Sequence, residues 1–93
     1  MAILNDNELD RYGQAFLCEL YRRAQGIAER RFDRYGVFRA LGLGGITGDE
    51  GIHQATDEIV QFLRREQLIR TYEDNHDVRL TDGGLDRARQ VCR

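Results

Sequence analysis

Apolar residues recur with a helical period along most of this chain and alternate with polar ones in a single stretch. From about residue 6 to residue 31 they return every three or four positions, which predicts a long amphipathic first helix. Asn5 or Asp6 can cap its beginning. The negative charges of Glu8 and Asp10 in the first turn interact favourably with the helix dipole. Its apolar positions cover about half of the helix circumference, more than the roughly 100° stripe that a core-facing helix needs.

The extra width of this first helix allows two interpretations. One flank packs in its own domain while the other packs against a twin subunit, which makes the chain a homodimer. Alternatively, the tyrosines only shield the edge of the apolar stripe and keep their hydroxyl groups in water. The residues that would form the dimer contact are Tyr12, Phe16, Leu17, Tyr21 and Ala28.

Two further helices are predicted before the alternating stretch. Asp33 can cap a short helix over about residues 33–42, which the following glycines stop. Thr47 and Glu50 match a capping box for a third helix over about residues 47–67. In this third helix the apolar residues lie on one side, and the Gln, Asp and Arg residues lie on the other.

The alternating stretch covers about residues 68–81. The run LIRTY alternates as a half-buried strand does, a polar turn follows, and the run VRL pairs back as a second strand. Thr81 can then cap a last helix over about residues 82–92. The pattern therefore predicts one α+β domain over residues 1–93, mostly helical.

Composition places the chain among globular proteins, because 41% hydrophobic and 32% charged residues are ordinary values for that class. No apolar run approaches the roughly 18–20 residues of a membrane span. The N-terminus lacks the basic and apolar segments of a signal peptide, so we expect cytoplasmic residence without a membrane. Cys18 and Cys92 lie far apart and form no CxxC motif, so we expect no disulfide.

The formal net charge of −2 is unevenly distributed. Residues 22–39 carry six Arg against two acidic residues and have a net charge of +4, whereas residues 40–63 carry four acidic residues and a net charge of −4. All fourteen basic residues are Arg. We favour a GC-rich genome as the cause, although arginine also grips phosphate in a bidentate way.

The runs FLRREQLIR and VRLTDGGLDRA resemble the winged-helix transcription-regulator superfamily. Many members have Gly where this chain has Gln67, and its third helix is longer than usual. The resemblance covers about residues 33–91 and implies a winged helix with three helices, a two-stranded wing hairpin and a C-terminal helix. The residues that match the superfamily pattern are Leu63, Leu68, Ile69, Leu80, Thr81 and Gly84.

This resemblance implies DNA binding in a transcription-regulator role. The third helix would enter the major groove, where Gln and Arg side chains read adenine and guanine edges, and the wing would touch the DNA backbone. The candidate contacts are His53, Gln54, Gln61, Arg64 and Arg65 on the helix, and Asn75, His76 and Arg79 on the wing.

An alternative function is that of a protein-interaction adaptor with the same fold and no nucleic-acid binding. The pI of about 5.6 is low for a DNA-binding domain, and acidic residues repel phosphate. An acidic helix and wing would suit a basic protein surface instead. The acidic residues in question are Asp49, Glu50, Asp57 and Glu58 on the third helix, and Glu73, Asp74 and Asp77 on the wing.

Catalytic groups are hard to find in this chain. It has no serine, and neither Cys18 nor Cys92 has a histidine nearby in sequence. His53 and His76 lack the spacing of metal ligands, and the acidic run 73–77 lacks the glycine and terminal glutamate of a calcium-binding loop. We therefore expect a non-catalytic protein without metal or cofactor.

Overall fold

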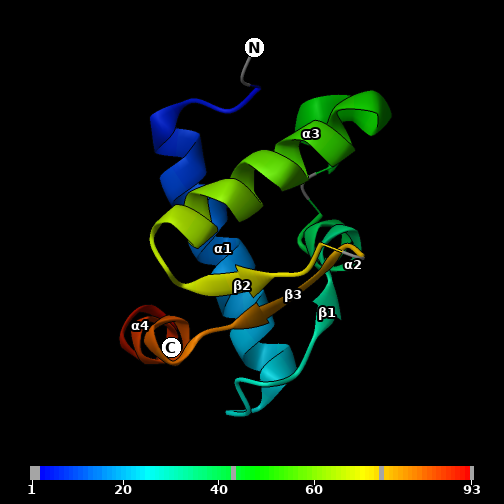
Figure 1. The fold of residues 1–93 in the computed structure, drawn as a ribbon. Helices are drawn as coiled ribbons and strands as arrows, with labels where there is room; N and C mark the ends of the chain where they lie inside the picture. The colour runs from blue at the N-terminus through cyan, green and yellow to red at the C-terminus, as the bar shows by residue number, and fades with distance from the viewer. Residues whose placement is uncertain (1–2, 43, 74, 93) are drawn as a thin grey trace.

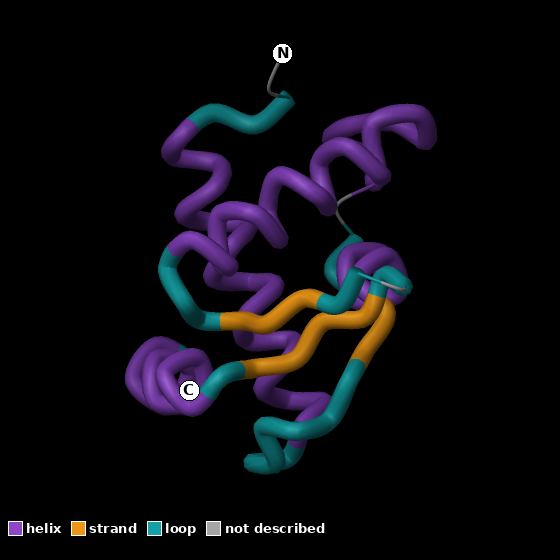
Figure 2. Tube along the Cα trace, viewed as in Figure 1, coloured by secondary structure: helices purple, strands orange, loops and turns teal. Residues whose placement is uncertain are grey.

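The computed structural model describes the backbone of residues 3–42, 44–73 and 75–92, and the side chains of these residues except those of 44–50. This part of the chain is mostly helical and of the α+β class, as predicted (Figures 1 and 2). In chain order its elements are α1 (Asp6–Ala24), β1 (Phe32–Asp33), α2 (Arg34–Ala40), α3 (Gly44–Arg65), β2 (Ile69–Thr71), β3 (Asp77–Leu80) and α4 (Asp82–Val91).

The first helix is shorter than predicted. It ends at Ala24 rather than near residue 31, because Gln25 and Gly26 adopt left-handed conformations with φ of 52° and 84°. The apolar residue Ala28 therefore lies in the following loop, where it still packs into the core. Helical spacing alone did not distinguish a continuing helix from a buried loop.

The other element boundaries differ less. Helix α3 begins at Gly44, three residues before Thr47, so Thr47 does not open the helix. The side chains of the expected capping box, Thr47 and Glu50, lie outside the described residues. Strand β1 was not predicted, because two residues are too few to show alternation.

The three strands form one antiparallel sheet in the order β1-β3-β2. Ile69 pairs with Leu80, and the next pair along is Arg70 with Arg79. Because neighbouring positions on a strand face opposite sides, Ile69 and Leu80 enter the core while Arg70 and Arg79 share the outward face. Helix α1 passes behind the sheet in Figure 1, on the side of the core.

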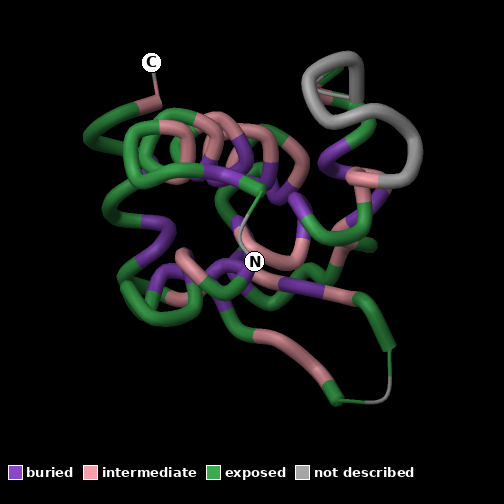
Figure 3. Tube along the Cα trace, turned by 90° about the horizontal axis from the view of Figure 1, so that it is seen from above, coloured by how far each residue is buried: buried purple, intermediate pink, exposed green. Residues whose placement is uncertain are grey.

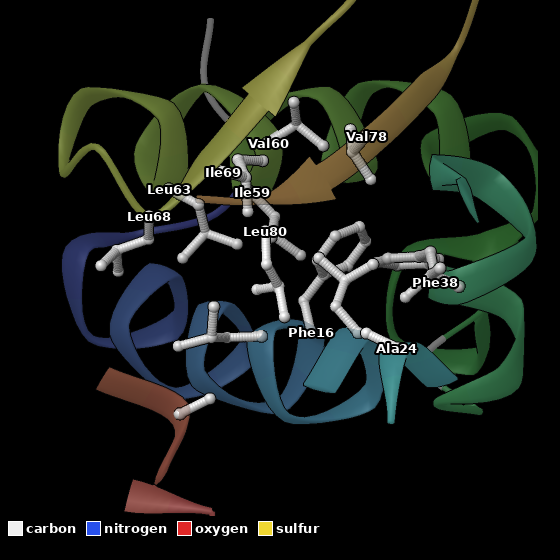
Figure 4. Close-up of a cluster of buried hydrophobic side chains, with 14 of the residues drawn as sticks. Phe16, Ala24, Phe38, Ile59, Val60, Leu63, Leu68, Ile69, Val78 and Leu80 are labelled. Atoms are coloured by element: carbon white, nitrogen blue, oxygen red, sulfur yellow. The ribbon is translucent and has the colours of Figure 1, made fainter. Parts of the chain in front are cut away.

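The core lies between the inner face of the sheet and helices α1, α2 and α3 (Figure 4). Phe16 and Phe38 are fully buried there together with Ile59, Leu63 and Val78. Buried, intermediate and exposed stretches alternate along the helices (Figure 3), as expected for amphipathic elements.

The wide apolar surface of α1 is used within this chain. The helix contacts α2, α3, α4 and β3, so several elements, rather than one core-facing stripe, account for its breadth. Phe16 and Leu17, which were expected at a dimer contact, have exposures of only 0% and 2%.

Helix α4 is attached to the rest of the chain at both ends. At its beginning Thr81 accepts a hydrogen bond from the Gly84 N–H (2.9 Å) and donates one to the Gln67 carbonyl (2.7 Å). At its end a disulfide joins Cys92 to Cys18 of α1. The expectation of no disulfide was wrong, because residues 74 positions apart in sequence are brought together by the packing of α4 on α1.

Among the described residues, no helix has both the length and the apolar character needed to cross a membrane.

Candidate nucleic-acid interface

The exposed side of α3 carries the five helix residues predicted to contact DNA. His53, Gln54, Gln61, Arg64 and Arg65 are all exposed. Gln54, Gln61 and Arg65 follow one another at spacings of seven and four residues, which places them on one face of the helix. His53 and Arg64 lie on the flank, where His53 contacts α2 and Arg64 approaches β2.

The carboxylate of Asp57, in the middle of this helix, is engaged within the chain. It accepts hydrogen bonds from the Arg34 guanidinium and from the Tyr35 hydroxyl, each at 3.2 Å. Burial of Tyr35 and the negative charge of Asp57 raise the pKa of the tyrosine hydroxyl, which therefore remains a proton donor. Pairing with Arg34 reduces the repulsion that Asp57 would exert on a phosphate.

Glu58 is also engaged. Its two carboxylate oxygens accept the backbone N–H groups of Ile3 at 2.7 Å and Leu4 at 2.8 Å, and one of them accepts the Gln54 side-chain amide at 3.0 Å. Burial alone would raise the pKa of Glu58, but these hydrogen bonds outweigh it and lower the pKa below its usual value. Glu58 thus holds the N-terminal segment on α3, and Gln54 is directed toward Glu58.

Tyr35 connects α2 with α3 and with the turn of the hairpin. Its ring lies 4.3 Å from the ring of His53 and 5.0 Å from that of His76, measured between centroids. Beside it, the backbone N–H and the Nε of Arg34 both donate to the carbonyl of His76, at 3.0 and 3.2 Å. The structure therefore brings His53 and His76 together on one tyrosine ring.

Arginines without carboxylate partners gather where α3 meets the outward face of the sheet. Arg64 and Arg70 line one open hollow, and Arg79 stands directly across the strands from Arg70. Like charges in such a cross-strand pair repel each other. Arg79 also has a buried Nε without a hydrogen-bond acceptor among the described residues.

The predicted wing residues do not converge on one spot. Asn75 stabilises the turn, since its side chain accepts the Asp77 N–H at 2.8 Å. The His76 carbonyl accepts hydrogen bonds from Arg34 of α2. Arg79 belongs instead with Arg64 and Arg70. At the tip, Asp77 pairs with Arg31, whose guanidinium also lies 3.7 Å from the centroid of the Tyr72 ring.

Three residues of this region were missing from the predicted site. The alternation of the run LIRTY already indicates that Arg70 faces outward like Arg79, so the sequence contained a signal for Arg70. It contained no signal for Arg34 or Tyr35, because their partners Asp57 and His76 are more than twenty residues away in sequence.

The predicted dimer contact is altered by the fold. Phe16, Leu17 and Ala28 are buried within this chain, and Tyr12 and Tyr21 are half-buried against the core. Of the five residues, only the two tyrosines retain surface for a partner.

In the described part of the chain, no group of three His, Cys, Asp or Glu side chains is arranged to hold a metal ion. Asp74, part of the acidic turn considered for calcium, lies outside the described residues.

Comparison of the chain with models of known protein families, with curated proteins and with solved structures gave no match, so the candidate interface is judged on its own geometry.

Proposed function

We propose that this chain is a winged-helix module that binds duplex DNA in a transcription-regulator role. In this proposal α2 and α3 form the helix-turn-helix, β2 and β3 form the wing, and α3 faces the major groove. The order of elements and the sheet order β1-β3-β2 support this assignment. Residence in the cytoplasm belongs to the same proposal.

One observation carries the proposal. Arg64, Arg70 and Arg79 form no ion pair with any described residue and lie close together where α3 meets the sheet, and Arg65 of α3 is unpaired as well. By contrast, Asp57 and Glu58 of the same helix are occupied by Arg34 and by backbone N–H groups. Unpaired guanidinium groups on a surface whose carboxylates are already hydrogen-bonded within the chain are suited to phosphate, because arginine binds phosphate through two parallel hydrogen bonds.

Fluorescence anisotropy with random duplex DNA tests the proposal. Binding should weaken steeply between about 50 mM and about 200 mM salt, because each phosphate contact releases a counterion. Arg64→Ala, Arg70→Ala and Arg79→Ala should each weaken binding and reduce the slope of log affinity against log salt by about one. Arg89→Ala is the matched control, because Arg89 already pairs with Asp86 on α4.

If the protein does not bind DNA at low salt, the proposal fails and the adaptor function remains. The exposed Glu73 and Asp82 would then be available for a basic protein partner. If DNA binds equally well to the control and to all three variants, the module binds DNA through another surface. A homodimer, if it forms, would use Tyr12 and Tyr21 of α1.

A further inference from the structure

The last turn of α4 is attached to the rest of the chain by the disulfide and by the packing of Cys92 against the core. Ala88 is the last described residue of the helix that is fully buried, and Arg89, Gln90 and Val91 are exposed. The Cys92 N–H donates to the Ala88 carbonyl at 2.7 Å, which is a bond within the helix end itself. The covalent link to Cys18 therefore holds this turn against α1.

The same turn forms one wall of a groove of about 260 Å³ between α1, the end of α3 and α4. Leu17, Leu63 and Leu68 supply apolar lining, and Phe62 is only half-buried there. Arg87 and Val91 form the α4 side of the groove. Because Val91 directly precedes Cys92, the position of the Val91 part of this wall depends on the disulfide.

We propose that Cys18 and Cys92 form a redox site that opens this groove. A dithiol reductant attacks one sulfur as a thiolate, forms a mixed disulfide and is then oxidised to its own cyclic disulfide. Two electrons and two protons pass to the protein, the Cys18–Cys92 bond breaks, and two thiols remain. The last turn of α4 is then released and the apolar lining of the groove becomes accessible.

The partial exposure of the two cysteine residues suits this chemistry. Both cysteines are only partly buried, so a small dithiol can approach them. In the cytoplasm, where we place this protein by proposal, disulfides are usually transient and redox-sensing rather than permanent. The reaction itself does not depend on DNA binding.

The rest of α4 should stay in place after reduction. Thr81 remains bonded to Gln67, Gly84 packs closely on the Leu68 carbonyl, and Leu85 and Ala88 are buried in the core. These contacts lie at the beginning and in the middle of the helix. Opening is therefore confined to the residues after Ala88.

Amide hydrogen exchange of the full chain, followed by NMR, tests this proposal. On addition of a dithiol, the amides of Gln90, Val91 and Cys92 should exchange about tenfold faster or more, because they open locally without unfolding. The amides of Gly84 and Leu85, at the capped end, should remain protected in the reduced protein, because they exchange only when more of the fold opens.

Two serine variants and one control variant make the result specific. Cys18→Ser and Cys92→Ser should both show the fast exchange with and without the dithiol, and Arg89→Ala should respond to the dithiol as the unaltered chain does. Unchanged exchange of the last turn in the serine variants would overturn the proposal. Equally low protection of Gly84, Leu85 and Val91 in the reduced protein would also overturn it, because the release would then extend over the whole of α4 rather than its last turn.

Discussion

Gly84 marks the closest approach between α4 and the rest of the chain. A Cβ atom built on this residue would collide with the backbone carbonyl of Leu68, which a neighbouring side chain cannot relieve by rotating. We expect Gly84→Ala to lower the free energy of unfolding by about 3 kcal/mol, because overpacking against backbone forces the helix to shift. Urea denaturation followed by circular dichroism measures this change.

Gly83→Ala is the matched control for that experiment. A Cβ atom on Gly83 would meet nothing closer than 3.7 Å, so this variant should change stability by less than about 1 kcal/mol. Similar losses in both variants would mean that helix propensity, rather than the contact with Leu68, explains the effect.

Single residues were predictable from the sequence where their partners are local. Asn5, Asp33 and Thr81 cap their helices, and each accepts an N–H from three residues further along. Such a pattern can be recognised because cap and helix are adjacent in sequence. The ion pair of Arg34 with Asp57 depends on how α2 packs on α3, and neither residue type indicates it.

At the scale of elements, the N-terminal segment depends on the charge of one side chain of α3. Glu58 holds the N–H groups of Ile3 and Leu4, and its pKa is lowered in the folded protein. A carboxyl group with a lowered folded pKa stabilises the fold above its unfolded pKa, near the usual 4.5, and this contribution is lost as the pH falls through the folded pKa.

We therefore expect the hydrogen bonds of the Ile3 and Leu4 N–H groups to Glu58 to weaken at acid pH, although the Leu4 side chain is also buried in the core. NMR should show the amide signals of Ile3 and Leu4 moving with the titration of the Glu58 carboxyl as the pH falls below about 4.5, the range in which an ordinary carboxyl group protonates. Glu58→Gln should abolish this coupling, whereas Glu73→Gln on the exposed hairpin should preserve it. Unshifted Ile3 and Leu4 signals throughout the titration would show that Glu58 does not hold the segment.

Helices and strands were predicted well where their hydrophobic pattern extends over many residues. They were predicted poorly where tertiary packing determines their ends or their contacts. All four helices were expected from the 3.6-residue period, and both strands of the hairpin from alternation. The breadth of the apolar face of α1 was given two interpretations, a twin subunit or tyrosines that shield its edge, and neither anticipated that α3, α4 and the sheet contact that helix. Hydrophobic width shows that a surface is covered, but the sequence does not say by which element.

At the scale of the whole molecule, the disulfide encloses most of the chain. Cys18 and Cys92 are 74 positions apart, and closing a loop of this length removes enough entropy from the unfolded chain to stabilise the fold by about 4 kcal/mol. Folded domains of this size have total stabilities of about 5–15 kcal/mol. The reduced protein should therefore remain folded, but with a much smaller free energy of unfolding.

Urea denaturation of the oxidised and the reduced protein measures the difference in their free energies of unfolding. The reduced form should unfold at a clearly lower urea concentration, by a free energy of about 4 kcal/mol. The double variant Cys18→Ser/Cys92→Ser should unfold near the reduced form and should not respond to reductant, which separates the loss of the bond from other effects of the reagent. Coinciding midpoints for the oxidised and reduced forms would show that the native contacts of α4, and not loop closure, determine the stability.

The core contains neither cysteine, so the folded state should survive reduction even though the unfolded chain gains freedom.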